Sequence, residues 1–480
     1  MNLIYGIKDK PKFGQMLVFA FQQILAILAA TIAVPAIINS NSDVLATFPE
    51  FATGQGMSAA AALFGAGVGT IIYQLFTKFK SPVFLGSSFA FIGSMCAAFA
   101  GAASAQAGFA GIILGAFFAG LAYVVIALVI KLAGVQWINK LMPAAVIGPT
   151  VTIIGLSLAG NAVGDLTKGK VLVEDVTRVV GKIDGVEAIV DHTDMVSGAS
   201  PYVCLICGLI TLFSVILISV YGKKMAKLIP FILGILIGYI AAAIFTVIGI
   251  KTNNPDLLVI DFSAFKDMTL FAIPDFTFIQ AFKGVKIDAT YIATIAAAYI
   301  PVAFVVFAEH LADHKNLSTI IGQDLTEDPG LHRTLLGDGV GSMFGAFFGG
   351  CPNTTYGESV GCVAITRNAS VITITTTAIM AMVISFFSPF VTFLASIPNC
   401  VMGGVCITLY GFIACSGLKM IQKVDLNENR NLFVVAVILI TGIGGLSITF
   451  GKVTITSIAC ALILGIIANL VLSGKDKAKK

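Results

Sequence analysis

Residues 293–314 read ATIAAAYIPVAFVVFAEHLADH, an apolar stretch that ends in four ionisable side chains. Residues 293–308 carry no charge, and with the polar end the stretch is long enough for one membrane-crossing helix. The ionisable residues are Glu309, His310, Asp313 and His314. Such side chains are costly inside a bilayer, so they mark a site for an ion, a proton or a substrate.

Composition places the whole chain in a membrane. It is 57% hydrophobic and 11% charged, with a mean hydropathy of +0.97, and apolar runs of spanning length recur along all 480 residues. The strict alternation of barrel strands is absent, so helices are expected to satisfy the backbone. We predict an all-α polytopic membrane protein with about fourteen spans, the first near Met16–Ile38 and retained because the polar start is no signal peptide.

Two polar segments interrupt this apolar pattern. Cys351–Glu358 reads CPNTTYGE, and Pro82–Phe91 in the first half reads PVFLGSSFAF. Each combines proline and glycine with residues that favour extended backbone, so we predict short extended breaks in spans 3 and 10. Such backbone is tolerated in a membrane only where protein buries it or where it lines a cavity. Its N–H groups, with those of the helix N-termini that follow, would face a ligand; a flexible kink without a ligand is the alternative.

The halves of the chain resemble each other. Leu63–Thr70, LFGAGVGT, matches Leu335–Ser342, LLGDGVGS, and the prolines that open the two breaks correspond. A third match pairs Pro143–Gly148 with Pro398–Gly403. With about seven spans in each half, the second copy enters the membrane from the opposite side, which predicts two inverted 7-span repeats, a transporter architecture. Chance recurrence of helix-packing glycines is the alternative.

Basic residues set the expected orientation. By the positive-inside rule both termini are predicted to be cytoplasmic, and the net charge of +4 reflects topology rather than nucleic-acid binding. The long loops at about 161–199 and 250–287 are assigned to the outside face. The first of them shows no periodicity. The residues predicted to be cytoplasmic are Lys8, Lys10, Lys12, Lys78, Lys80, Lys131, Lys140, Lys223, Lys224, Lys227, Lys315, Arg333, Arg367, Lys419, Lys423, Arg430 and the tail from Lys475 to Lys480.

A metal site is one reading of the polar cluster on residues 309–314. His310 and His314 have a valid i, i+4 ligand spacing, which keeps a metal-ion transporter or membrane metalloenzyme open. However, there is no HExxH motif, and the remaining histidines, His192 and His332, fall in predicted loops. The Cys204–Cys207 pair lies in an apolar segment without a second cysteine pair, so no metal, cofactor or enzymatic activity is expected.

Several motifs carry a resemblance to a known family. The chain resembles, over nearly its whole length, the uracil permease branch of the nucleobase/ascorbate transporter family. The motifs that carry the resemblance are Gly86–Phe91 (GSSFAF), Ala308–His310 (AEH), Asp328–Arg333 (DPGLHR), and Asn353–Glu358 (NTTYGE) with Ala364–Arg367 (AITR). The NTTYGE and AITR combination is the most specific of them.

The resemblance implies an architecture and an activity. It implies a transporter in the cell (plasma or inner) membrane that takes up a nucleobase, with uracil and protons as partners, in the lipid bilayer and as a homodimer. It also implies a core domain from residues 1–133 and 288–395, which hold spans 1–4 and 8–11. The gate domain is then expected from residues 134–250 and 396–472.

The resemblance also implies the site residues. Substrate would meet the carboxylates of Glu309 and Glu358 and the main-chain amides of Phe89 and Gly357, and the ring of Phe89 or Tyr356 would cover its face. A site of this kind suits uracil, whose N–H groups need acceptors and whose carbonyls need donors. A purine such as xanthine, ascorbate or a small inorganic anion remains an alternative ligand.

One departure from the family pattern concerns proton handling. This branch often has histidine at the position of Asp313, whereas here His314 follows one residue later. On a helix Glu309 and Asp313 share one face, while His310 and His314 share another roughly 100° away. All four are candidates for proton coupling, and we hypothesise that Asp313 supports or replaces the missing imidazole. For sodium coupling the carboxylate to watch is Asp338, which is otherwise read as a charge near a helix N-terminus.

Overall fold

The computed structural model describes residues 3–134, 136–183, 186–223, 226–266, 268–282, 287–450 and 453–473. These residues are predominantly helical, as predicted, and eight of their helices are long and apolar enough to cross a membrane. The count of fourteen spans and the inverted repeat stay predictions. Lys224 and the tail from Lys475 to Lys480, used in the orientation argument, lie outside the described residues.

The chain divides into two compact units. The first comprises residues 1–159, 269–391 and 409–480, and the second comprises residues 160–268 and 392–408. This division follows compactness alone, so the predicted core and gate domains stay a prediction.

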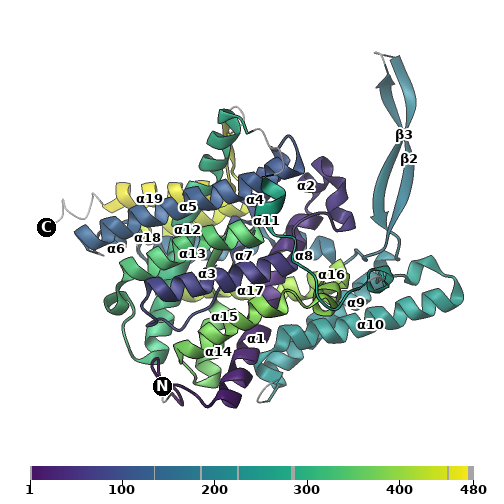
Figure 1. Cartoon of the computed structure of the whole chain (residues 1–480). Coiled ribbons are helices and arrows are strands. Elements are labelled where there is room, and N and C mark those ends of the chain that lie inside the picture. Colours follow the sequence, from purple (N-terminus) through teal and green to yellow (C-terminus); the bar gives the residue numbers. More distant parts are fainter. Residues whose placement is uncertain are drawn as a thin grey trace. The chain divides into compact units, whose positions relative to one another are not determined.

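The first unit contains most of the helices (Figure 1). The helices and the strand of its first part are α1 (Phe13–Ser40), α2 (Ser42–Thr47), α3 (Ala59–Phe76), β1 (Leu85–Ser87), the short helix η2 (Phe89–Phe91), α4 (Ile92–Ala100), α5 (Ala105–Ala133), α6 (Gln136–Leu141) and α7 (Ala144–Ser157). Its later part contains α11 (Thr277–Ala281), α12 (Ala289–Ile321), α13 (Leu331–Gly349), β4 (Asn353–Thr355), α14 (Gly357–Thr366), α15 (Val371–Ile384), α18 (Asn429–Ile443), β5 (Ile448–Phe450), β6 (Val453–Ile455) and α19 (Ser457–Ser473).

The second unit is smaller. It contains most of α8 (Ala159–Asp165), the strands β2 (Leu172–Ile183) and β3 (Val186–Ser197), and the helices α9 (Pro201–Tyr221) and α10 (Pro230–Thr252). Helices α16 (Ser388–Ser396) and α17 (Asn399–Ile421) each have residues in both units.

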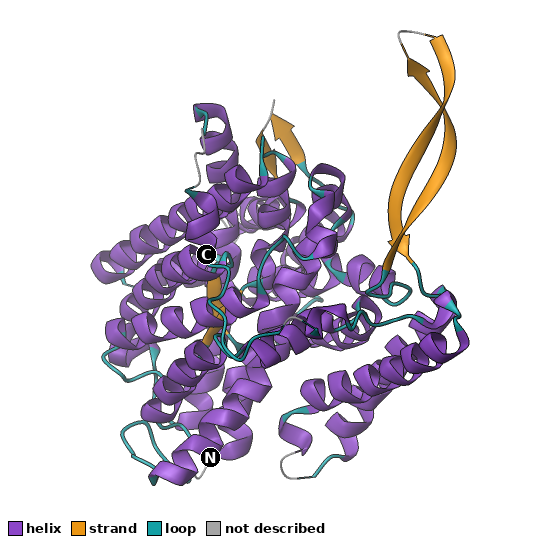
Figure 2. Cartoon of the chain, turned by 45° about the vertical axis from the view of Figure 1, so that its right-hand side comes forward, coloured by secondary structure: helices purple, strands orange, loops and turns teal. Residues whose placement is uncertain are grey.

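Strands β2 and β3 correct one interpretation of the sequence. The segment 161–199 was expected to be a polar loop without periodicity, but residues 172–183 and 186–197 pair as two long antiparallel strands (Figure 2), with Ile183 opposite Val186. The sequence carries the signal for it, because Val and Ile recur on both sides of an Asp-Gly pair at 184–185. The strands are hard to predict because many charged residues lie between the β-branched residues that favour them.

The two matching glycine motifs meet in space. Helices α3 and α13 pack side by side (Figure 1). A Cβ on Gly69 would lie 2.8 Å from the carbonyl oxygen of Gly341, and one on Gly341 would lie 2.7 Å from the carbonyl oxygen of Gly69. Only glycine permits this approach of the two backbones, which explains the small residues in both motifs.

The two predicted breaks also meet, which the sequence did not predict. Strands β1 and β4 pair antiparallel, with Leu85 opposite Thr355 and Ser87 opposite Asn353. The Ser88 N–H donates to the Pro352 carbonyl at 2.9 Å, extending the pairing beyond the strands. Each break therefore satisfies the backbone of the other, as buried non-helical chain in a membrane protein requires.

Candidate functional site

The strand pair places two helix beginnings at one point of the fold. Helix α14 begins at Gly357, one residue after the end of β4, and η2 begins at Phe89, one residue after the end of β1. The first N–H groups of a helix have no partner within it and attract anions and carbonyl oxygens. Gly357 is exposed and Glu358 half-buried, so the start of α14 is accessible, as a ligand would require.

The carboxylates of α12 lie against this strand pair. Helix α12 packs against both β4 and α14. Glu309 and Asp313 are half-buried on one face of the helix, and the Thr355 hydroxyl of β4 donates a hydrogen bond to Asp313 Oδ2 at 2.8 Å. Within the described part of the chain, no lysine or arginine forms a salt bridge with Glu309, Asp313 or Glu358. The site therefore combines carboxylates that have no salt bridge to lysine or arginine among the described residues with donors at helix beginnings.

The histidines occupy the other face of α12, as the helical spacing predicts. His310 and His314 are completely buried, and their rings stack at 4.0 Å between centroids. His310 Nδ1 lies 2.7 Å from Asp338 Oδ2, and its Nε2 lies 3.0 Å from the hydroxyl of Thr334. His314 Nε2 lies 2.6 Å from the hydroxyl of Tyr73. The imidazoles thus bind α3 and α13, away from the carboxylate face.

Asp338 does not lie at a helix N-terminus. It is buried about two turns into α13, which begins at Leu331, and it bonds to His310. The reading of Asp338 as a terminal helix charge is therefore wrong. The sequence gave no sign of the pairing, because Asp338 and His310 belong to different helices. Its second oxygen, Oδ1, has no hydrogen-bond partner among the described residues.

The two aromatic candidates have different surroundings. Phe89 is almost completely buried and meets Tyr410 of α17 edge to face, with ring centroids 5.7 Å apart. Tyr356 is also buried, and its hydroxyl donates to the Ser87 carbonyl at 2.9 Å. Its ring lies against Gly86, where a side chain would collide with it. Tyr356 of the β4 end therefore bonds to and packs against strand β1.

Several polar side chains that hydrogen-bond beside the strand pair were not predicted from the sequence. The Gln23 amide of α1 donates to the Ser359 hydroxyl, which also accepts from the Phe84 N–H at 3.0 Å. Ser359 directly follows Glu358 and was within reach of motif reasoning. Tyr73 and Gln23 lie inside apolar runs that looked like ordinary spans, and only the fold connects them to the site.

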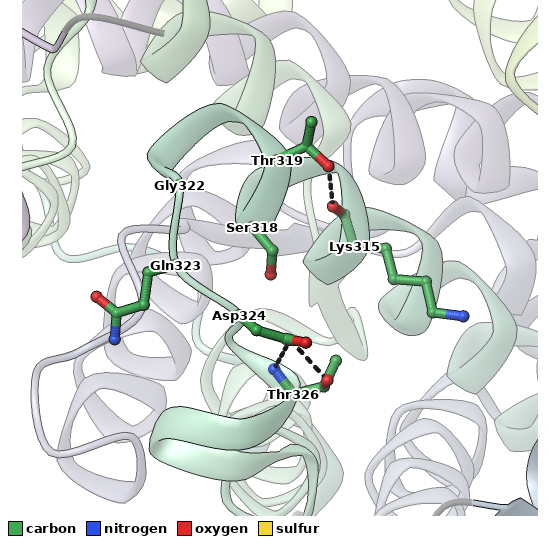
Figure 3. A pocket seen from close by; sticks show the side chains of 7 residues that line it. All are labelled: Lys315, Ser318, Thr319, Gly322, Gln323, Asp324 and Thr326. Carbon is green, nitrogen blue, oxygen red and sulfur yellow. Dashed lines mark hydrogen bonds between the residues drawn. The ribbon is translucent and has the colours of Figure 1, made fainter.

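Two surface hollows lie elsewhere. One is formed by the C-terminal end of α12 and the loop that follows, where the N–H and hydroxyl of Thr326 hydrogen-bond Asp324 and hold the pKa of that carboxyl below its usual value (Figure 3). The other is lined by Leu3, Gly6, Ile7, Lys8, Asp9, Lys80, Ile321, Gln323 and Asp328. Neither includes a predicted substrate residue. Among the described residues, no group of three or more His, Cys, Asp and Glu residues is arranged to hold a metal.

The arrangement of paired breaks, half-helices and intramembrane carboxylates is that of a transporter. A family model described as "Permease family" matches residues 14–450. The chain belongs to this permease family. The resemblance noted from the motifs is thereby confirmed, and the permease is a membrane transporter rather than an enzyme.

Curated relatives cover the permease from end to end. It is 35% identical to the uracil permease of Bacillus caldolyticus over 99% of this chain and 96% of that one. It is 34% identical to the uracil permease of Bacillus subtilis, over 97% and 94%. With the uracil permease of Escherichia coli K12 it shares 31%, over 97% and 93%.

Solved structures with the same fold are more distant in sequence. The transmembrane domain of the cyanobacterial bicarbonate transporter BicA aligns over 97% of this chain and 100% of that one, with a TM-score of 0.53 and 18% identity. The murine anion transporter Slc26a9 in its inward-facing state aligns over 98% and 69%, with a TM-score of 0.61 and 12% identity. These likenesses establish the fold alone.

Proposed function

We propose that this permease imports uracil by proton symport. The observation that carries the proposal is the β1–β4 pair, which brings the exposed start of α14, with Gly357 and Glu358, to the carboxylate face of α12. The names of the relatives described above support uracil as the ligand, because those proteins match nearly the whole chain.

The chemistry of the ligand fits these groups. Uracil is a flat ring in which N–H donors alternate with carbonyl acceptors. Glu309 and Glu358 accept from the N–H groups, and the main-chain amides of Phe89 and Gly357 donate to the carbonyls. A ring that lacks one of these groups leaves a polar atom of the site unpaired, which is the strongest basis for discrimination.

Proton coupling follows from the charge of the site. Glu309, Asp313 and Glu358 face one place without a basic partner among the described residues, and uracil is neutral. A proton taken up from outside offsets part of this charge while substrate is bound. One charge moved inward through 100 mV contributes ~2.3 kcal/mol, enough for roughly fifty-fold accumulation. We propose Glu309 and Asp313 as the proton-carrying pair, with His310 and His314 supporting them.

The wider proposal concerns how the permease works in a membrane. The core domain, residues 1–133 and 288–395, carries the substrate past a gate domain, residues 134–250 and 396–472, by alternating access. The protein is a homodimer in the cell membrane with both termini in the cytoplasm. Phe89, in the proposed core domain, meets Tyr410, in the proposed gate domain, edge to face, and this contact would have to break if the two domains moved apart.

Uptake into proteoliposomes tests the proposal. Radiolabelled uracil should accumulate when an inward proton gradient is imposed, and this accumulation should disappear when the gradient is collapsed. Glu358→Gln should abolish uptake, whereas Glu327→Gln, at an exposed glutamate after α12, should leave it unchanged. If uracil did not accumulate while radiolabelled xanthine, ascorbate or bicarbonate did under the same gradient, the permease would have another ligand and the proposal would be overturned.

A further inference from the structure

The buried face of α12 contains a hydrogen-bonded link that the proposed substrate site does not use. The hydroxyl oxygen of Tyr73, in α3, lies 2.6 Å from His314 Nε2 and 2.7 Å from Ser81 Oγ. All three residues are at most 1% exposed. Ser81 belongs to the segment that leads into β1. One hydroxyl therefore joins α3, α12 and the chain entering the strand pair.

The tautomer of His314 follows from the hydrogen bond of its Nδ1 atom. His314 Nδ1 lies 2.8 Å from the main-chain carbonyl of His310, an atom that can only accept. The hydrogen is therefore on Nδ1, and Nε2 of the neutral ring is left as an acceptor that faces the Tyr73 hydroxyl. Without the Tyr73 hydroxyl this buried nitrogen has no partner, and an unpaired buried acceptor is more costly than the net value of one hydrogen bond.

The link lies in a packed region shared with the substrate side. Tyr73, Leu85 of β1, Leu317 of α12 and Val360 and Val363 of α14 belong to one buried apolar cluster. The same α14 begins with Gly357 and Glu358. The hydroxyl thus anchors α12 to the elements that present the substrate-facing atoms.

Helix geometry connects this anchor to the carboxylates. His314 directly follows Asp313 in the uninterrupted helix α12, and adjacent side chains are about 100° apart. Holding His314 against Tyr73 sets the rotation of α12, and the rotation sets where Asp313 and Glu309 point.

We propose that Tyr73 and His314 are positioning residues that set the rotation of α12 and thereby aim Glu309 and Asp313 at the substrate. The inference rests on the proposed function for its transport readout. It does not depend on which nucleobase the permease carries.

The substitutions that test the link are conservative. Tyr73→Phe removes only the hydroxyl. His314→Gln keeps an acceptor near the position of Nε2, whereas His314→Asn reaches only the position of Nδ1. Tyr123→Phe is the matched control, because Tyr123 is a buried tyrosine of α5 whose hydroxyl has no hydrogen-bond partner among the described residues.

Kinetics of uracil uptake give the first readout. Tyr73→Phe and His314→Asn should each raise KM by about three- to tenfold, the size expected for one lost hydrogen bond, with a smaller change in the maximal rate. Tyr123→Phe should stay within about twofold of the parent, and His314→Gln should raise KM less than His314→Asn does. The double variant Tyr73→Phe/His314→Asn should be no worse than either single one, because both break the same contact.

A second readout needs no substrate. Cys415 is an exposed free thiol, so the background protein carries Cys415→Ser. With Glu309→Cys added, the rate of alkylation by a small maleimide beyond that of the background reports how α12 presents position 309. Adding Tyr73→Phe should change this rate at least about threefold, while Tyr123→Phe should not. Absent uracil uptake by the parent would overturn the proposed function but not this link. Unchanged KM together with unchanged alkylation in the Tyr73→Phe protein, or additive effects in the double variant, would overturn the link.

Discussion

Thr355 donates its hydroxyl to Asp313 across 2.8 Å, joining strand β4 to helix α12 two residues before Gly357. The bond occupies one carboxylate oxygen, and Asp313 Oδ1 would lie only 3.8 Å from a Cβ built on Gly357. Asp313 therefore faces the side of Gly357 on which a Cβ would stand, at the start of α14. Its place beside the proposed ligand amide gives the hypothesis for Asp313 a geometric basis.

Replacing Thr355 by valine should weaken uracil uptake. Valine keeps the shape of the side chain but removes the donor to Asp313 Oδ2, so the carboxylate loses its fixed position. We expect KM to rise by about three- to tenfold with little change in protein yield, measured in proteoliposomes. Thr376→Val is the control, since the exposed Thr376 hydroxyl bonds only to the Ile372 carbonyl of its own helix. Equal effects of the two substitutions would contradict a role for the Thr355 contact.

Asp313→Asn should change the pH dependence of transport. Asparagine can still accept from Thr355 but cannot bind or release a proton. If Asp313 takes part in proton coupling, uptake in the variant should respond less to external pH and to an imposed proton gradient. The measurement is initial uptake between pH 5 and 8, an interval chosen to bracket neutrality. A pH profile that superimposes on that of the parent would remove Asp313 from the coupling mechanism.

Features of the site that depend on one short segment of the sequence could be predicted. The breaks at Pro82–Phe91 and Pro352–Glu358 are visible because proline, glycine and serine interrupt apolar runs locally. The two faces of α12 followed from its period. Both features are short-range, and the structure confirms extended backbone at residues 85–87 and 353–355 and places the histidines apart from the carboxylates.

The pairings between distant segments could not be predicted in the same way. Nothing in the neighbourhood of Asp338 indicates His310, and Tyr73 lies in an apolar run that carries no charge of its own. These contacts depend on how α3, α12 and α13 pack, which local propensity does not encode. The hairpin at 172–197 was missed for another reason, because its charged residues concealed a β-branched pattern.

Breaking the His310–Asp338 pair should destabilise the protein. Both side chains are buried, and removing one partner leaves the other unpaired, which is strongly unfavourable for groups of this kind. Asp338→Ala should lower the apparent melting temperature of the purified protein in detergent. The double variant Asp338→Leu/His310→Phe should recover part of the loss, because both polar groups are then replaced by apolar ones. A double variant less stable than Asp338→Ala would contradict this account of the pair.

The contact of α3 with α13 gives the last prediction. Gly69 and Gly341 face each other so closely that a methyl group at either position would press on a backbone carbonyl, which cannot move aside as a flexible side chain can. Gly341→Ala should therefore lower the apparent melting temperature and the amount of folded protein, and Gly341→Leu should prevent folding, because overpacking forces the helices apart.

Gly411→Ala, at a helical glycine of α17 with no atom near its Cβ direction, is the matched control and should be neutral or slightly stabilising, since alanine favours the helix. If Gly341→Ala were as stable as Gly411→Ala, α3 and α13 would have to be farther apart than the structure places them. The β1–β4 pair would then be affected as well, because Asn353 of β4 donates its side-chain amide to the Gly65 carbonyl of α3 at 3.1 Å. The glycine contact thus holds α3 where Asn353 of β4 bonds to it, and a loss of uracil uptake in Gly341→Ala is expected to accompany its loss of stability.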